Sequence, residues 1–205
     1  MILNGSWLRV FVSVLMGSLL FACATSTPTN RQNICALFEE KSGWYKDAKK
    51  AADKWQSSVP IIMSIMYQES AFVAKARPAR TKILWIIPGP RPSDAYGYPQ
   101  ARDNTWDWYQ DKTGQFSARR YDFADAADFI AWYNFQSNQM AGIALNDAFN
   151  LYLAYHEGQG GFKRGTYKGK NWLLNTAKTV AARTANYDAQ LKNCQAELER
   201  KRGWF

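Results

Sequence analysis

Apolar positions along the chain recur mostly every three or four residues, which is the spacing of one face of an α-helix. Alternation of apolar and polar residues, the pattern of a half-buried strand, is almost absent. The pattern predicts short helices over 34–38, 46–55, 60–69, 124–133 and 143–155, and a long helix that begins near residue 171. We therefore expect a mainly α-helical domain.

The long C-terminal helix carries its apolar residues in a single stripe, because they step by four and three positions. The stripe comprises Leu173, Ala177, Val180, Thr184, Tyr187, Leu191, Cys194 and Leu198. We expect this face to pack inward, with Cys194 on the same side as Tyr187.

One carboxyl group, that of Glu69, closes the otherwise apolar helix predicted over 60–69. Pro60 suits a first helical position, and the two serines before it are capping candidates. Ile62, Ile65, Met66 and Glu69 share one face. This face points to the core, so burial should raise the pKa of the Glu69 carboxyl and make it a candidate general acid. The alternative is a structural role, as a cap or a salt bridge at the end of the helix.

The segment 74–113 breaks the helical pattern with five prolines and two glycines, and we expect a long irregular loop there. Within it, the apolar run 83–87 (Ile-Leu-Trp-Ile-Ile) argues against simple disorder. The run predicts either a strand or a lid across a groove.

The first 22 residues have the layout of an export signal, with Arg9 ahead of the apolar run 10–21. The run is short for a bilayer span, which needs about 20 residues. Segment 20–23 (Leu-Phe-Ala-Cys) resembles the lipobox of bacterial lipoproteins, in which the cysteine is lipidated and becomes the new N-terminus, although Phe21 replaces the small or β-branched residue usual there. The alternative is an uncleaved anchor helix, and both interpretations place the globular part outside the cytoplasm.

Residues 24–32 are rich in Thr, Ser, Pro and Asn and are typical of a short solvated tether. Residue 24 is alanine rather than aspartate, which by resemblance to enterobacterial lipoproteins implies the outer membrane, facing the periplasm. We divide the chain into a lipoprotein signal peptide over 1–22, a flexible tether over 23–34 and one domain over 35–205.

Of the three cysteines, we expect one to carry a lipid and the other two to form a disulfide. If Cys23 carries lipid, Cys35 and Cys194 are the pair left in an oxidising compartment, where disulfides persist. The alternative is two free thiols. Because the chain contains one histidine, no cluster has metal-ligand spacing, and we expect no metal and no other cofactor.

The formal net charge of +9 falls to +8 when Arg9 leaves with the signal, and its cations are scattered along the chain. A basic exported protein suits the anionic cell wall and phospholipid surfaces. Export and the lack of a recognition motif argue against nucleic acid as a partner.

Three motifs, in order, resemble those of the lytic transglycosylase branch of the lysozyme-like superfamily, the branch related to goose-type lysozyme. Glu69-Ser70 is similar to the Glu-Ser of the first motif. Segment 93–100 (Ser-Asp-Ala-Tyr-Gly-Tyr-Pro-Gln) resembles the second, which in the family runs from Ser and Ala to Gly-Leu-Met-Gln. Segment 154–158 (Ala-Tyr-His-Glu-Gly) resembles the third, Ala-Tyr-Asn-Ala-Gly, and Asn186-Tyr187 is similar to the Asn-Tyr of the last conserved helix.

The resemblance implies a single lysozyme-like domain with an irregular lobe, which could include a small β-sheet. It implies that the partner is the glycan strands of peptidoglycan, and we expect the protein to be a monomer. Glu69 would be the sole catalytic acid and base, and the product would carry a 1,6-anhydromuramic end. The substrate-binding residues implied by the motifs are Ser70, Tyr96, Gln100, Tyr155, His156 and Tyr187.

The departures from the motifs leave other functions open. Tyr98-Pro99 replaces Leu-Met, and His156-Glu157 replaces Asn-Ala. A non-catalytic wall-binding or assembly lipoprotein could carry such changes. A muramidase that uses water would need a second carboxylate, for which the loop acids Asp94, Asp103 and Asp107 are candidates.

Tryptophans supply further candidates for stacking on sugar rings in a groove. We expect Trp106 or Trp108 there, with Trp85 as a further candidate, and we expect Trp132 to lie in the core.

Overall fold

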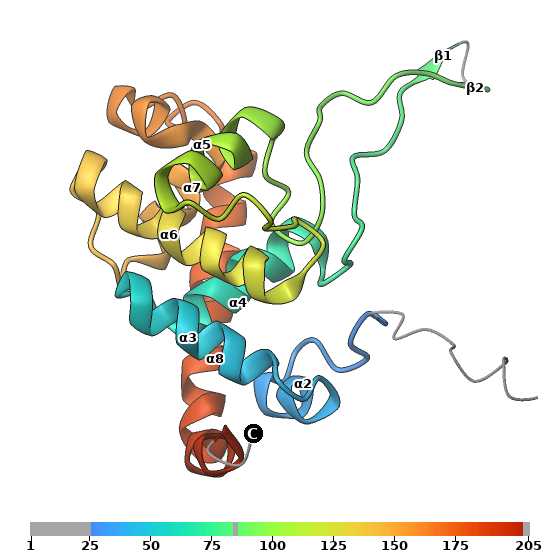
Figure 1. Cartoon of the computed structure of the whole chain (residues 1–205). Coiled ribbons are helices and arrows are strands. Elements are labelled where there is room, and N and C mark those ends of the chain that lie inside the picture. The colour runs from blue at the N-terminus through green and yellow to red at the C-terminus, as the bar shows by residue number, and fades with distance from the viewer. Residues whose placement is uncertain (1–25, 84–85, 203–205) are drawn as a thin grey trace, which may run out of the picture.

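The structure is a computed structural model that describes residues 26–83 and 86–202. It is mainly α-helical, as predicted (Figure 1). The elements in chain order are α2 (Ile34–Glu40), α3 (Trp44–Trp55), α4 (Val59–Ser70), β1 (Lys82–Ile83), β2 (Ile87–Pro88), α5 (Asp103–Thr113), α6 (Phe123–Ala141), α7 (Ala148–Arg164) and α8 (Asn171–Arg202).

Helix α8, the long C-terminal helix, packs against α2, α4 and α7. Its predicted start at residue 171 is confirmed, and every member of the predicted stripe is buried or partly buried. On the other side, α6 packs against α3, α4 and α7. Helix α4 packs against both α8 and α6 and lies in the middle of the helices in Figure 1.

Helix α4 lies inside this bundle because almost nothing on it is polar. Every residue from Val59 to Met66 is buried. Ser58 caps the helix by accepting a hydrogen bond from the backbone N–H of Ile61 at 3.4 Å, and Pro60 lies in the first turn, where a missing N–H costs nothing. The last turn of α4 therefore brings Glu69 to the interior.

The predicted disulfide between Cys35 and Cys194 is confirmed, with a Cα–Cα distance of 6.0 Å. It joins α2 to α8 across a sequence separation of 159 residues. A covalent link between segments so far apart restricts the unfolded chain strongly, so this bond stabilises the attachment of α2.

Within the tether predicted over 23–34, the residues that the structure describes make hydrogen bonds to the domain. The backbone N–H and the hydroxyl of Thr29 both donate to the carboxylate of Glu40 at 2.8 Å. Lys41 donates to the hydroxyl of Ser26 at 2.7 Å, and the side chain of Asn33 caps α2. The polar side chains of Thr29 and Ser26 thus have partners at the C-terminal end of α2 and just after it. The predicted signal peptide and Cys23 lie outside the described residues.

The irregular segment is shorter than predicted, because helix α5 occupies residues 103–113. Trp106 and Tyr109, one turn apart, are the buried residues of α5, and Gly114 ends the helix in a left-handed conformation. The prolines and glycines before residue 103 led us to extend the predicted loop to residue 113, although its last part is helical. Between α4 and α5, the chain bends back at a tight bridge between Tyr96 and Ala101.

Ile83 and Ile87, at the two ends of the run 83–87, lie in a strand pair and not in a lid. Strand β1 pairs antiparallel with β2, with Lys82 opposite Pro88 and Ile83 opposite Ile87. The hairpin stands away from the helices on two long chain segments (Figure 1). Leu84 and Trp85 lie outside the described residues.

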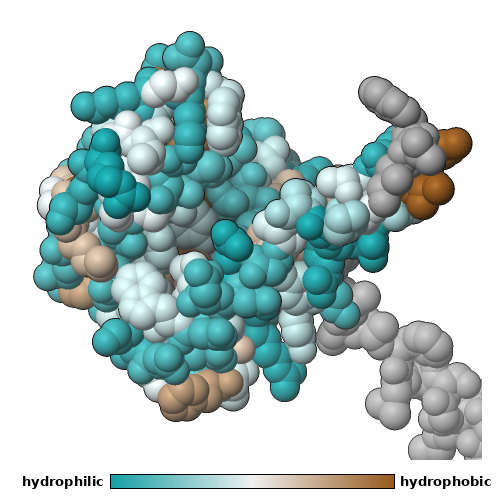
Figure 2. Space-filling view, turned by 90° about the horizontal axis from the view of Figure 1, so that it is seen from above, coloured by the Kyte–Doolittle hydropathy of each residue, from teal (hydrophilic) through white to brown (hydrophobic). Residues whose placement is uncertain are grey.

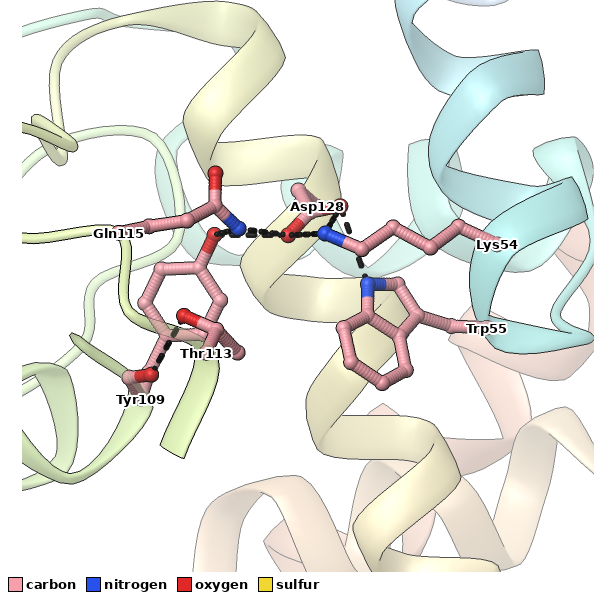
Figure 3. Close-up of polar contacts among 6 residues, drawn as sticks. All are labelled: Lys54, Trp55, Tyr109, Thr113, Gln115 and Asp128. Atoms are coloured by element: carbon pink, nitrogen blue, oxygen red, sulfur yellow. Dashed lines mark hydrogen bonds and ion pairs between the residues drawn. The ribbon is translucent and has the colours of Figure 1, made fainter. Parts of the chain in front are cut away.

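A polar network around Asp128 of α6 holds α3 and α5 in place. The carboxylate accepts hydrogen bonds from Lys54 Nζ at 3.0 Å, Trp55 Nε1 at 3.0 Å, the Tyr109 hydroxyl at 2.7 Å and Gln115 Nε2 at 2.7 Å (Figure 3). A mostly buried charge requires such partners. The network orients the next turn of α6, where Phe129 and Tyr133 face the cavity described below.

The helices predicted elsewhere are present with different ends. Helix α6 extends eight residues beyond the predicted end at 133, to Ala141. The helix predicted over 143–155 begins at Ala148, where Asp147 caps it, and ends at Arg164. Among the described residues, no helix combines the length and the apolar character that a membrane span requires.

Candidate active site

A cavity of about 390 Å³ opens between the end of α4, the loop before α5, and helices α6 and α7. Its walls combine polar and aromatic side chains from segments far apart in the sequence. The lining residues are Glu69, Ser93, Ala95, Gln100, Ala101, Arg102, Thr105, Phe129, Tyr133, Tyr155, His156, Glu157 and Gly158. Residues of all three sequence motifs thus meet in one cavity.

Glu69 places its carboxyl group in this cavity from the last turn of α4. Burial raises the pKa of Glu69 from 4.5 to about 7, and a hydrogen bond from Tyr152 opposes part of that rise. At neutral pH the protonated and ionised forms are therefore both populated. A carboxyl group of this kind can donate a proton in one step and accept one in the next.

Tyr152 is the hydrogen-bond partner of Glu69, and the sequence analysis missed it. The Tyr152 side chain is buried, and its hydroxyl donates to the Glu69 carboxylate. Burial and the nearby carboxylate raise the pKa of the Tyr152 hydroxyl, so it remains a donor. Its position one helical turn before Tyr155, on the same face of α7, was the available signal.

Tyr155 lines the cavity but donates its hydrogen bond elsewhere. Its hydroxyl donates to the carbonyl oxygen of Pro99 at 2.7 Å, and its ring packs edge-on against Tyr133 with 5.2 Å between centroids. Burial, followed by the negative charge of Glu69, raises the pKa of the Tyr155 hydroxyl well above its usual value. Tyr155 thus links α7 to the loop on the opposite side of the cavity.

The loop segment 97–100 makes a turn that only glycine permits at its first position. Gly97 has φ of 76°, and a Cβ there would lie 2.1 Å from the backbone oxygen of Arg120. Gln100 closes the turn through its side-chain amide nitrogen, which donates to the carbonyls of Ala76 at 3.0 Å and Gly97 at 2.8 Å. Gln100 lines the cavity, with its amide nitrogen committed to the turn.

Comparison with known families gives a match over residues 11–194, to the family described as "Transglycosylase SLT domain". The chain belongs to this family. It is therefore an enzyme of the lytic transglycosylase type, and peptidoglycan is its substrate. No curated protein and no solved structure gave a match. The matched region contains all the motifs noted in the sequence.

The transglycosylase does not bring three of the predicted substrate-binding residues to the cavity wall. Ser70 is buried, and its hydroxyl donates to the carbonyl of Met66 at 3.1 Å. The Tyr96 ring lies under the guanidinium group of Arg77, with 4.2 Å to the ring centroid. Both side chains are occupied by the protein itself.

Tyr187 is the third of these residues, and it belongs to the inward stripe of α8. It is almost fully buried, and its hydroxyl donates to the backbone oxygen of Arg31. Its stripe position, visible in the sequence, was the better guide to its location than the motif.

His156 and Glu157 lie at the edge of the cavity, where the transglycosylase departs from the family motif. Burial raises the pKa of Glu157, but hydrogen bonds from Lys170, Thr166 and His156 outweigh it and hold the pKa at about 2. Lys170 Nζ lies 2.7 Å from one carboxylate oxygen, and His156 Nδ1 lies 2.9 Å from the same oxygen. Glu157 is therefore a fixed anion and cannot serve as a proton donor near neutral pH.

Gly158 follows this pair and kinks α7, with φ of 71° and ψ of 157°. A residue with a side chain rarely adopts this conformation. The helix predicted over 143–155 was expected to end near this kink, but the helix resumes after Gly158 and continues to Arg164. It also turns the chain so that Gly158 itself lines the cavity.

The loop acids considered as second carboxylates do not line the cavity. Asp94 pairs with Arg102 Nε at 2.9 Å, and this hydrogen bond lowers the pKa of Asp94. Asp103 pairs with Arg120 at 2.5 Å, and Asp107 is exposed on α5. Glu69 and Glu157 are the carboxylates on the cavity wall.

The tryptophans expected in a groove are absent from the cavity wall. Trp106 is buried against Tyr109 and Phe129, and Trp108 packs edge-on against Trp132 at 4.5 Å between centroids. The prediction that Trp132 lies in the core is confirmed. Trp85 lies outside the described residues. Within the part of the chain that is described, no group of three or more His, Cys, Asp or Glu side chains could hold a metal ion.

Proposed function

We propose that this transglycosylase cleaves the β-1,4 bond between N-acetylmuramic acid and N-acetylglucosamine and forms a 1,6-anhydromuramic end, with Glu69 as the sole acid and base. The observation that carries the proposal is the buried carboxyl group of Glu69 on the cavity wall, where burial raises its pKa to about 7. The other carboxylate on the wall, Glu157, is ionised and bound by three donors.

In the first step, protonated Glu69 donates its proton to the glycosidic oxygen, and the bond from that oxygen to C1 of the muramic acid breaks. The positive charge that develops at C1 is stabilised by the sugar's own 2-acetamido group, which takes the place of a second carboxylate. Glu69 leaves this step ionised, with Tyr152 donating to it.

In the second step, the Glu69 carboxylate removes the proton from the C6 hydroxyl of the same sugar, and the C6 oxygen bonds to C1. The carboxyl group regains its proton, so the enzyme returns to its starting state and no water is consumed. A pKa near the working pH suits both halves of this cycle, because neither protonation state is strongly disfavoured.

The walls of the cavity would hold the glycan for this chemistry. Gln100 of the loop and His156 of α7 offer polar groups, and the rings of Phe129, Tyr133 and Tyr155 offer apolar surface. Tyr155 and Gln100 both support the 97–100 turn, so we assign them the added role of positioning that wall.

We also propose that the chain is exported and lipidated on Cys23, and that the domain is a monomer held at the outer membrane, facing the periplasm. The export-signal composition of residues 1–22 and the disulfide between Cys35 and Cys194 support this placement, since such bonds persist in oxidising compartments.

Digestion of purified sacculi tests the reaction, because mass spectrometry separates its possible products. Anhydro ends support the proposal. Reducing ends would instead identify a muramidase that uses water, and no release would identify a non-catalytic binding protein. Glu69→Gln should abolish release, whereas Glu39→Gln, on the exposed face of α2, should leave it unchanged. Release by Glu69→Gln at the wild-type rate would remove Glu69 from the mechanism.

A further inference from the structure

The two chain segments that lead into and out of the hairpin of β1 and β2 form a projecting arm, and hydrogen bonds join them. The N–H of Thr81 donates to the carbonyl of Pro90 at 3.0 Å, and the N–H of Gly89 donates to the carbonyl of Thr81 at 2.7 Å. Arg80 adds a hydrogen bond to the carbonyl of Gly89 at 3.2 Å. These contacts are within the arm, so its direction away from the helices (Figure 1) is not explained by packing against them.

The end of this arm exposes large apolar side chains to solvent. Ile86 is 84% exposed, more than any other large hydrophobic residue that the structure describes, and Ile87 is 53% exposed. Figure 2 shows a brown patch on the projecting arm, separate from the body of the domain. Two neighbouring isoleucines at the end of a projecting hairpin indicate a surface that is covered in use.

The same arm is strongly basic. Between residues 75 and 91 the sequence has five cations and no acidic residue. The cations are Lys75, Arg77, Arg80, Lys82 and Arg91, and all are exposed. Where the structure describes the chain, no ion pair within 4.0 Å joins any of them to a carboxylate, and Arg80 and Arg91 donate to backbone carbonyls instead. Their charge is therefore free to attract an anionic surface.

The arm points to the side of the domain on which the described chain begins. In Figure 1 the blue segment with which the described chain begins lies on the same side of the helices as the hairpin. Cys23 precedes Ser26 by three residues, which span at most about 10 Å. A lipid on Cys23, as proposed above, would hold this side of the domain close to the bilayer.

We propose that the hairpin docks on an anionic phospholipid membrane, with Ile86 and Ile87 at the boundary of headgroups and acyl chains and with Lys82 and Arg80 among the headgroups. Cations alone would suit any polyanion, including wall polymers, but an apolar tip above a ring of cations suits a membrane interface. The orientation argument rests on the proposed lipid anchor, whereas the exposed tip and its charge do not.

Docking would fix the position of the cavity above the bilayer. The chain leaving β2 continues directly into the loop that carries Ser93, Ala95 and Gln100, all on the cavity wall. A membrane contact at the tip, added to the anchor, holds the domain at two points and limits its rotation. The glycan strands within reach would then be those at one height above the membrane.

The test uses the full chain reconstituted in vesicles that contain phosphatidylglycerol, with an environment-sensitive fluorophore on a single introduced cysteine. The fluorophore on Ile86→Cys should shift to shorter wavelength and be quenched by brominated lipids. The matched control is Phe116→Cys, an apolar residue 71% exposed in the loop after α5, whose label should remain aqueous. An aqueous label at position 86, or equal quenching at both positions, would overturn the proposal.

The charge is tested with the double variant Arg80→Glu/Lys82→Glu carrying the same label. We expect the ratio of inserted to free label to fall about fivefold for each cation lost, since a cation near an anionic surface contributes about 1 kcal/mol. Vesicles of phosphatidylcholine alone should give at least as large a loss, because they remove the attraction for every cation of the arm. An unchanged ratio in both experiments would contradict docking on anionic lipid, and insertion that appears only with added peptidoglycan would contradict it too.

Two measurements separate this proposal from those on which it depends. Uptake of label by the parent chain, which has no introduced cysteine, reports a free thiol at Cys23, and flotation with the vesicles reports anchoring. If the protein floats while the label at position 86 remains aqueous, the lipid anchor is retained and docking of the arm is refuted. Release from sacculi in solution should be unaffected by the double variant. Loss of that release would show that the arm binds the wall, and it would overturn membrane docking.

Discussion

Replacing Glu69 by glutamine should make the protein more stable at high pH while it removes the catalytic acid. Burial raises the pKa of Glu69 from 4.5 to about 7, which means that the folded protein disfavours the ionised form. Glutamine has nearly the same shape, cannot ionise, and its side-chain oxygen can accept the hydrogen bond from Tyr152. The substitution therefore isolates the cost of the charge.

The size and sign of the effect follow from the two pKa values. Below pH 4.5 both the folded and the unfolded chain hold the proton, so Glu69 imposes no cost. Between pH 4.5 and 7 the unfolded chain releases its proton and the folded chain retains it, so the free energy of unfolding falls as the pH rises. Above pH 7 the full cost is about 3 kcal/mol, because one pKa unit corresponds to about 1.4 kcal/mol.

Urea unfolding of wild type and Glu69→Gln at pH 5 and pH 8 measures this difference. We expect the variant to be more stable by about 3 kcal/mol at pH 8 and by less than about 1 kcal/mol at pH 5. The control, Glu39→Gln, should show no such dependence, since Glu39 is exposed. Equal stability of wild type and variant at both pH values would show that the Glu69 carboxyl is not desolvated, and the argument for its catalytic role would fail with it.

Two further predictions concern the partner of the acid and the disulfide. Tyr152→Phe removes the hydrogen bond that lowers the pKa of Glu69, so the alkaline limb of the kcat/KM profile should move up by about one pH unit. Tyr155→Phe should leave that limb in place, because the Tyr155 hydroxyl donates to a loop carbonyl, and an equal shift in both variants would refute the assignment. Cys194→Ser should lower the free energy of unfolding by about 2–5 kcal/mol in urea, because the lost bond closes a loop of 159 residues. Wild type treated with reductant should match this variant, and a midpoint equal to that of the oxidised protein would contradict the prediction.

The elements that the sequence predicted best are those that depend on local information. Helix α4 begins one residue before its predicted start and ends one residue after its predicted end, because a cap, a proline and an unbroken apolar run all lie within it. Helix α8 begins where its stripe begins. Helix α5 was missed because its few apolar residues follow a stretch of prolines and glycines, and its helical state depends on burying Trp106 and Tyr109 against α6.

The catalytic candidate was visible in the sequence because a lone acid at the end of an apolar helix is rarely placed there without a partner or a cavity. The apolar periodicity, the acid and the order of the motifs were sufficient to predict the fold class and the family, and the cysteine count was sufficient to predict the disulfide. Each of these predictions depends on residue types and spacings within one segment of the chain, or on the number of cysteines.

Only the tertiary structure decided which side chains meet. The approach of α4 to α7 selects Tyr152 rather than Tyr155 as the donor to Glu69, and the chain between α7 and α8 brings Lys170 to Glu157. The hydrogen bonds of Thr29 with Glu40 and of Ser26 with Lys41 have the same origin. Such contacts depend on angles and distances between segments far apart in the chain, and these are set by how the whole core packs.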